Sequence, residues 1–174
     1  MNITRHIVAF SGHRSYDGSA DIELRKAIKE LYDAGARIFR VGMAEGFDLA
    51  AGKAVVELME IYDDITIEAH IPYPNFASRF DSRSKELYNT ILCKAQVVRY
   101  AGFAYQVDIF HRRNDMLVER ATHLIAWWDG SKSGTGYTVS RARRHGGVVI
   151  NLHPTAVAEQ EKIVRRRLCL LNSR

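Results

Sequence analysis

Short apolar segments of about six residues alternate along the chain with longer segments in which apolar residues recur every three or four positions. The short segments predict buried β-strands, and the longer ones predict amphipathic helices. The predicted strands cover residues 3–10, 37–41, 65–71, 96–100, 123–128 and 147–152. The predicted helices cover about 19–34, 48–62, 84–95, 109–117, 135–145 and 156–168.

The regular alternation of strand and helix, with no hairpin signal, predicts βαβ units and a parallel sheet. We therefore expect an α/β fold in which residues 1–174 form a single domain of three layers. A mostly parallel sheet of about six strands lies in the middle, and helices cover both of its faces. The crossover connections should be right-handed.

Two patterns predict where individual elements lie. On the first helix, the inner face is assigned to Ile22, Ala27, Ile28 and Leu31. The strand at 65–71 alternates isoleucine and alanine with polar residues, which indicates one wetter face and an edge position in the sheet.

Composition places the chain among ordinary globular proteins, with 47% hydrophobic and 26% charged residues in 174 positions. No apolar run approaches the roughly 20 residues of a membrane span, so we expect no membrane association. The sequence enters its first strand directly, without a signal-peptide pattern, so we expect a cytoplasmic protein. The formal net charge of +5 favours anionic partners. Several of the basic residues cluster near the C-terminus, where a solvated helix face and nucleic-acid contact are both open interpretations. They are Lys162, Arg165, Arg166, Arg167 and Arg174.

Small and polar residues gather where predicted strands end, in the segments at 11–15, 42–48 and 129–135. In open α/β sheets, ligands bind outside the carboxyl ends of the strands. The sequence therefore predicts one binding site at that edge of the sheet.

The first two of these loops offer different ligand groups. After the first strand, Ser11 and Gly12 precede His13, which titrates near neutral pH, and Arg14, which suits phosphate or carboxylate. The second loop places glycines and acidic residues before a helix, so that a carboxylate is available for ribose hydroxyls or for the helix N-terminus. Its candidate residues are Gly42, Ala44, Glu45, Gly46 and Asp48.

Arg113 falls on the apolar stripe of its predicted helix, which includes Ile109, Phe110 and Leu117. A cation that points toward a core requires an anion or several acceptors. We therefore assign Arg113 and the adjacent Asn114 to the site; pairing of Arg113 with a carboxylate of its own domain is the alternative.

The third loop ends where a helix is expected to begin, so its free backbone N–H groups form a natural anion-binding site. Its candidate residues are Asp129, Gly130, Ser133, Gly134 and Thr135. The sequence lacks the dinucleotide fingerprint, the P-loop, metal-binding motifs and the nucleophile elbow of esterases. We therefore expect neither a cofactor nor a metal.

The segments FSGHR, GMAEGFDLAA, RRNDMLVERATHLIAWWDG and SGTGYTVSRA, taken together, resemble the SLOG superfamily and in particular its YpsA-like branch. The resemblance covers about residues 5–150. It implies a Rossmann-like fold that binds a nucleotide or nucleotide-derived ligand at the carboxyl edge of the sheet, as a sensor or processing module. Because members of this superfamily often pair, the resemblance leaves a homodimer open as an alternative to a monomer.

Two better-understood relatives imply competing functions. LOG-type phosphoribohydrolases cleave a base from a nucleoside monophosphate, and here Arg113 and Gly134–Thr135 match their pattern. The position of their catalytic glutamate is occupied by Thr138 here. Glu45 or Asp48 would therefore have to supply the missing carboxylate. The catalytic candidates are Glu45, Asp48 and Arg113. DprA-type proteins load recombinase onto single-stranded DNA, and their core resembles residues 7–60. Aromatic residues interleaved with basic ones, as expected of a strand binder, are not evident.

Overall fold

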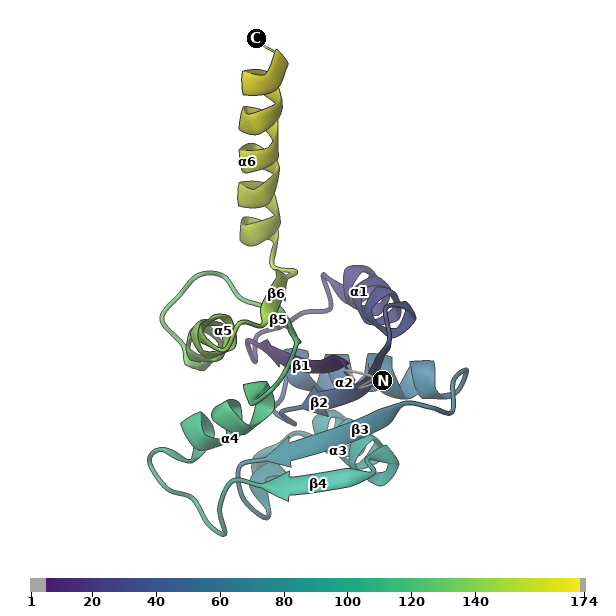
Figure 1. The fold of residues 1–174 in the computed structure, drawn as a ribbon. Helices are drawn as coiled ribbons and strands as arrows, with labels where there is room; N and C mark the ends of the chain where they lie inside the picture. The colour runs from purple at the N-terminus through teal and green to yellow at the C-terminus, as the bar shows by residue number, and fades with distance from the viewer. Residues whose placement is uncertain (1–5, 173–174) are drawn as a thin grey trace.

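The computed structural model describes residues 6–172, including the side chains up to residue 166, and has a Rossmann-like α/β architecture (Figure 1). Six parallel strands form one sheet in the order β4-β3-β2-β1-β5-β6. The strands are β1 (His6–Gly12), β2 (Ala36–Val41), β3 (Thr66–Ile71), β4 (Val97–Tyr100), β5 (His123–Trp127) and β6 (Val148–Asn151). The helices are α1 (Asp21–Asp33), α2 (Phe47–Met59), α3 (Ser82–Lys94), α4 (Ile109–Val118), α5 (Gly134–Arg144) and α6 (Pro154–Asn172), with a 3₁₀ turn η1 (Phe76–Arg79).

Helices cover both faces of the sheet and enclose two cores. Alternation along the central strands divides their side chains between these cores, because successive residues of a strand point to opposite faces. Phe10 and Ile125 join the larger core with α1, α2 and α3, whereas Ala9 and Leu124 join the smaller core with α4 and α5. The predicted three-layer arrangement is therefore confirmed.

The central strand β1 pairs with β2 on one side and with β5 on the other. The chain first builds β2, β3 and β4 outward from β1, and then returns through α4 to add β5 and β6 on the opposite side. This reversal is a topological switch point, where the loops after adjacent strands diverge and leave a crevice. The loops after β1, β2 and β5 therefore meet around one place.

Two of the detailed predictions are wrong. Strand β3 is not an edge strand, because β4 covers its outer side. Its expected wet face is also buried, since Glu68 is 8% exposed and binds Arg40 with 2.8 Å between Oε2 and Nε. On α1, Ile22 is 78% exposed, and the inner face consists of the other three predicted residues together with Leu24 and Tyr32. The expected start of the first strand, at residues 3–5, lies outside the described residues.

The last helix, α6, differs from the other five because it extends away from the sheet (Figure 1). Within the described residues, no helix combines the length and the apolar character that crossing a bilayer requires.

Candidate functional site

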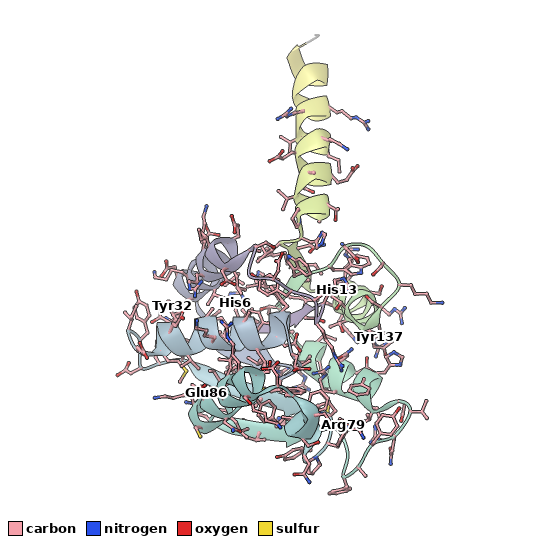
Figure 2. The ribbon with its side chains drawn as sticks, turned by 180° about the vertical axis from the view of Figure 1, so that it is seen from behind. His6, His13, Tyr32, Arg79, Glu86 and Tyr137 are labelled. Carbon is pink, nitrogen blue, oxygen red and sulfur yellow. The ribbon has the colours of Figure 1, made fainter. Side chains whose placement is uncertain are left out.

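The loops at the switch point enclose a cavity of about 270 Å³. Its walls come from the loops after β1, β2 and β5 and from one face of α4. The lining residues are Ser11, Gly12, His13, Arg14, Ala44, Asp48, Phe110, Arg113, Asn114, Ser133, Gly134 and Thr135. Figure 2 shows His13 near the loop that leads into α5, and Tyr137 on α5 itself.

Arg113 lies inside the protein at the wall of this cavity, and it is only 6% exposed. Its Nη1 donates a hydrogen bond to the carbonyl oxygen of Gly42, and its Nε donates to Asn114 Oδ1 at 2.8 Å. The same Nη1 lies 3.6 Å from Oδ2 of Asp48, in the first turn of α2. The position of Arg113 on the apolar stripe predicted an anionic partner. The structure shows that this partner is Asp48.

Burial changes the protonation of both members of this pair. It raises the pKa of Asp48 to about 6, although the charge of Arg113 and the amides of Ala44 and Gly12 act in the opposite direction. Burial also lowers the pKa of Arg113, while Asp48 acts to raise it. Arginine remains protonated in proteins, whereas Asp48 changes charge just below neutral pH. The positive charge of Arg113 is therefore only partly balanced in mildly acidic solution.

Two glycines let the second loop approach its neighbours closely. A Cβ atom on Gly42 would lie 2.4 Å from Asp48 Oδ2 and 2.7 Å from Arg113 Nη1. Gly46 has a φ of +81°, and a Cβ there would lie 2.5 Å from the carbonyl oxygen of Arg14. Any larger residue would push apart the groups that form the cavity.

The start of α5 supplies backbone donors to the same cavity. The first N–H groups of a helix have no partner within the helix. Ser133 caps one of them, because its Oγ accepts a hydrogen bond from the Gly136 amide at 3.1 Å. The amides of Gly134 and Thr135 remain without an intrahelical acceptor, at the positive end of the helix dipole. Asn114 Nδ2 donates to the Gly134 carbonyl at 3.4 Å and thereby joins α4 to this turn.

A side-chain bridge joins the first and third loops. His13 Nε2 lies 2.9 Å from Asp129 Oδ1, and the same oxygen accepts a hydrogen bond from the Ser131 amide. Hydrogen bonds from Ser131, followed by the contact with His13, lower the pKa of Asp129 to about 2. Asp129 is therefore ionised at neutral pH and holds His13 in place.

Most of the predicted site residues meet at this cavity, since eleven of its twelve lining residues were candidates from the sequence. Of the remaining candidates, Gly42 and Gly46 lie directly behind the wall. Glu45 is half-buried in the same loop and is not among the lining residues. Asp129 and Gly130 line a different and larger cavity beside α6.

Phe110 is the lining residue that the site prediction missed. It was assigned only to the apolar stripe of its helix. Its place three residues before Arg113 is the signal that was available, because residues three apart share one face of a helix.

The fold and the cavity define a Rossmann-like protein with a polar cavity at the carboxyl edge of its sheet. The YpsA family model, described as the YspA SLOG family, matches residues 20–146. The chain belongs to this family. A curated relative, the UPF0398 protein of Bacillus pumilus (strain SAFR-032), is 25% identical over 126 residues, which cover 71% of this chain and 68% of that protein.

Two solved structures share the fold. DNA processing protein A (DprA) from Streptococcus pneumoniae is 21% identical with a TM-score of 0.64, over 83% of this chain and 49% of that one. DNA processing protein A from Helicobacter pylori, a structure that describes a single-stranded DNA binding mode, is 17% identical with a TM-score of 0.62. It covers 83% of this chain and 63% of that one. This chain therefore covers about half of the first of these proteins and less than two thirds of the second. The likeness concerns the fold alone.

Proposed function

We propose that the protein binds a nucleotide-type ligand whose phosphate occupies the cavity between Arg113 and the start of α5. The observation that carries this proposal is the convergence of a buried guanidinium and the free amides of Gly134 and Thr135 on one cavity. Such donors suit an anion with several oxygen atoms. Arg14, exposed at the rim, adds a second guanidinium.

The size and surroundings of the cavity indicate how the rest of the ligand is placed. Its volume of about 270 Å³ is slightly below the range of about 300–1,000 Å³ that is usual for small-molecule sites. A phosphate and a sugar therefore occupy the cavity, and the base lies at its rim. Phe110 lines that rim and contacts Tyr105, with 6.3 Å between the ring centroids. Tyr105 is 64% exposed, so an aromatic surface is available to a base.

Thermal shift with a panel of nucleoside monophosphates, followed by isothermal titration, tests this proposal. Replacing Arg113 with Met or Arg14 with Ala should each weaken phosphate binding by roughly 10- to 100-fold, as expected for a lost charged hydrogen bond of about 1.5–3 kcal/mol. Arg14→Ala is the more secure variant, because Arg14 is exposed. Arg25→Ala, in an exposed ion pair on α1, is the matched control. No binding of any monophosphate, or binding by both site variants as tight as that of the unaltered protein, would contradict the proposal.

Hydrolysis of a nucleotide N-glycosidic bond is a second candidate function, favoured by Asp48. This carboxyl group lines the cavity, and its pKa of about 6 suits an acid or base that works near neutral pH. Thr138, at the position of the glutamate of LOG-type enzymes, is fully buried and donates to the Gly134 carbonyl. Release of free base that disappears in Asp48→Asn would establish this activity, and the absence of turnover would exclude it.

Binding of single-stranded DNA is a third candidate, supported by the likeness to DNA processing protein A. The loop before α4 exposes Phe103 at 97% and Tyr105 at 64%, and Tyr105 contacts Phe110 of the cavity wall. Exposed aromatic rings beside a basic cleft are typical of strand binders. A gel shift with steep salt dependence, reduced in Phe103→Ala, would support this function. Unchanged mobility of the oligonucleotide would exclude it.

A further inference from the structure

The helix α6 carries apolar side chains that the described part of the protein leaves exposed. Every residue from 157 to 166 is exposed, including Val157 at 44%, Ile163 at 37% and Val164 at 47%. Helices in proteins obtain most of their stability from packing of an apolar face against other elements. A helix that projects from the sheet with such a face exposed is typical of one that packs against a partner.

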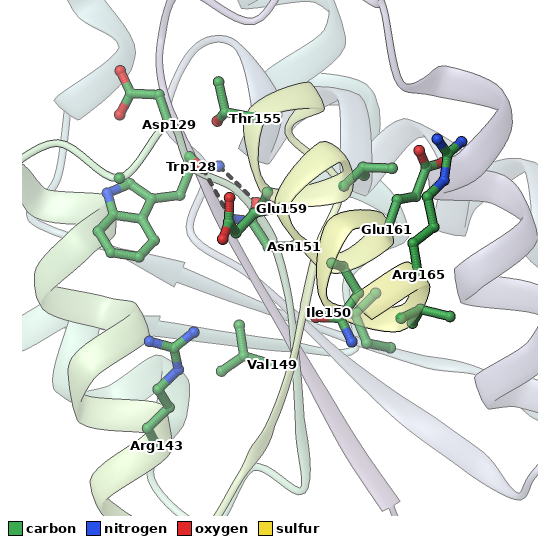
Figure 3. A pocket seen from close by; sticks show the side chains of 15 residues that line it. Trp128, Asp129, Arg143, Val149, Ile150, Asn151, Thr155, Glu159, Glu161 and Arg165 are labelled. Atoms are coloured by element: carbon green, nitrogen blue, oxygen red, sulfur yellow. Dashed lines mark hydrogen bonds between the residues drawn. The ribbon is translucent and has the colours of Figure 1, made fainter. Parts of the chain in front are cut away.

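A groove runs between this helix and the body of the protein (Figure 3). Its volume is about 1010 Å³. Apolar side chains contribute from both walls, with Val149 and Ile150 on β6 and Val157 and Val164 on α6. The groove thus continues the exposed apolar face of the helix onto the sheet.

The charges of α6 are separated along its length. Glu159 and Glu161 lie in its second turn, whereas Lys162, Arg165 and Arg166 follow. Two such helices that run in opposite directions place acidic residues against basic ones at both ends. With a two-fold axis near residue 163, Glu161 of one copy lies opposite Arg165 of the other, and both residues line the groove. Two parallel helices would instead align like charges.

We propose that the groove binds α6 of a second copy of this chain, so that two α6 helices pair in an antiparallel dimer. The surface is self-complementary, as a two-fold interface requires. The apolar residues of each helix fill the groove of the other copy, and the charged residues fix the direction of pairing. This inference is independent of the proposed ligand, since it concerns a different cavity.

Sedimentation equilibrium of the full chain over a range of concentrations tests the pairing. The unaltered protein should be a dimer, and Val164→Glu should weaken the dimer by at least about tenfold because it places a charge in the apolar groove. Ala158→Glu is the matched control, because Ala158 is exposed on α6 outside the groove. Circular dichroism checks that both variants keep their helix content.

Charge exchange tests the direction of pairing. One variant carries Glu159→Arg with Glu161→Arg, and the other carries Arg165→Glu with Arg166→Glu. Each alone should remain largely monomeric, because like charges then face each other, and an equimolar mixture should recover a heterodimer. A monomeric unaltered protein, an equal effect of Ala158→Glu and Val164→Glu, or a mixture that does not pair would overturn the proposal.

Discussion

At the scale of single residues, the pair formed by Arg113 and Asp48 determines the chemistry of the cavity. Both side chains are nearly inaccessible, and they lie 3.6 Å apart with Gly42 beside them. Burial of this pair is costly for the folded protein unless further hydrogen bonds compensate. The Gly42 carbonyl and the Asn114 side chain supply these bonds to Arg113.

The raised pKa of Asp48 predicts that anion binding depends on pH. Because its folded pKa of about 6 lies above the ordinary value of 3.8, Asp48 loses its charge as pH falls from 7 to 5. Sulfate keeps its own charge over this range, so its affinity should rise with the loss of the nearby negative charge. Titration calorimetry at the two pH values measures this effect. Asp48→Asn should bind sulfate with a much smaller dependence on pH, and an unchanged dependence would contradict the assignment.

The same pKa fixes the sign of its effect on stability. A carboxyl group whose pKa is raised by folding is protonated more readily in the folded state. Its contribution is therefore most favourable at low pH and is lost as pH rises from about 4 through 6.

Gly42→Ala should lower the free energy of unfolding by about 2–4 kcal/mol, because its Cβ would overlap both charged groups of the pair. Urea denaturation measures this change. Gly134→Ala is the matched control: only Asn114 Nδ2 lies within 4 Å of its Cβ, at 3.8 Å, and alanine is favoured in a helix. Equal stability of Gly42→Ala and the unaltered protein would show that the pair is not tightly held.

At the scale of elements, the position of α4 governs the site, because this helix carries Arg113 and Asn114. Arg40 on β2 contacts the C-terminal end of α4. Its Nη1 donates hydrogen bonds there to the carbonyl oxygens of Met116, Leu117 and Glu119. Arginine near the C-terminus of a helix satisfies carbonyl groups that lack partners within the helix.

Arg40→Met should therefore destabilise the protein by about 3–5 kcal/mol, because it leaves Glu68 buried without its partner. Adding Glu68→Gln should restore part of the loss. Arg25→Met removes an exposed ion pair and should cost at most about 1 kcal/mol. Thermal and urea denaturation of the three variants measures these differences, and a similar cost for Arg40→Met and Arg25→Met would contradict the role of Arg40.

The elements and most of the residues that line the cavity were predictable from the sequence for identifiable reasons. Alternation of apolar runs with amphipathic segments fixes the βα order, and a charged residue on an apolar stripe indicates Arg113. The position of β3 was not predictable, because the polar residues Glu68 and His70 indicated a solvent-exposed face. Their burial depends on Arg40, which is distant in the sequence. Ile22 was misplaced because spacing alone does not show where a helix meets its neighbours.

At the scale of the whole molecule, strand order brings the site together. The reversal between β1 and β5 places loops from residues 11–14, 44–48 and 133–135 around one cavity, although they are far apart in the sequence. The loop at 129–135 borders both cavities, with Asp129 and Gly130 toward α6 and Ser133–Thr135 toward Arg113. The proposed ligand site and the proposed dimer surface therefore share one loop.

The most direct test of the central claim is an amide NMR titration of the unaltered protein with inorganic phosphate at constant ionic strength. The amides of Gly134 and Thr135 and the side-chain amide of Asn114 should show saturable shifts, whereas chloride should leave them unchanged. Amides of α1, such as that of Lys26, should not move. Absence of saturable shifts at Gly134 and Thr135, or saturable shifts confined to other parts of the chain, would contradict an anion site at this edge of the sheet.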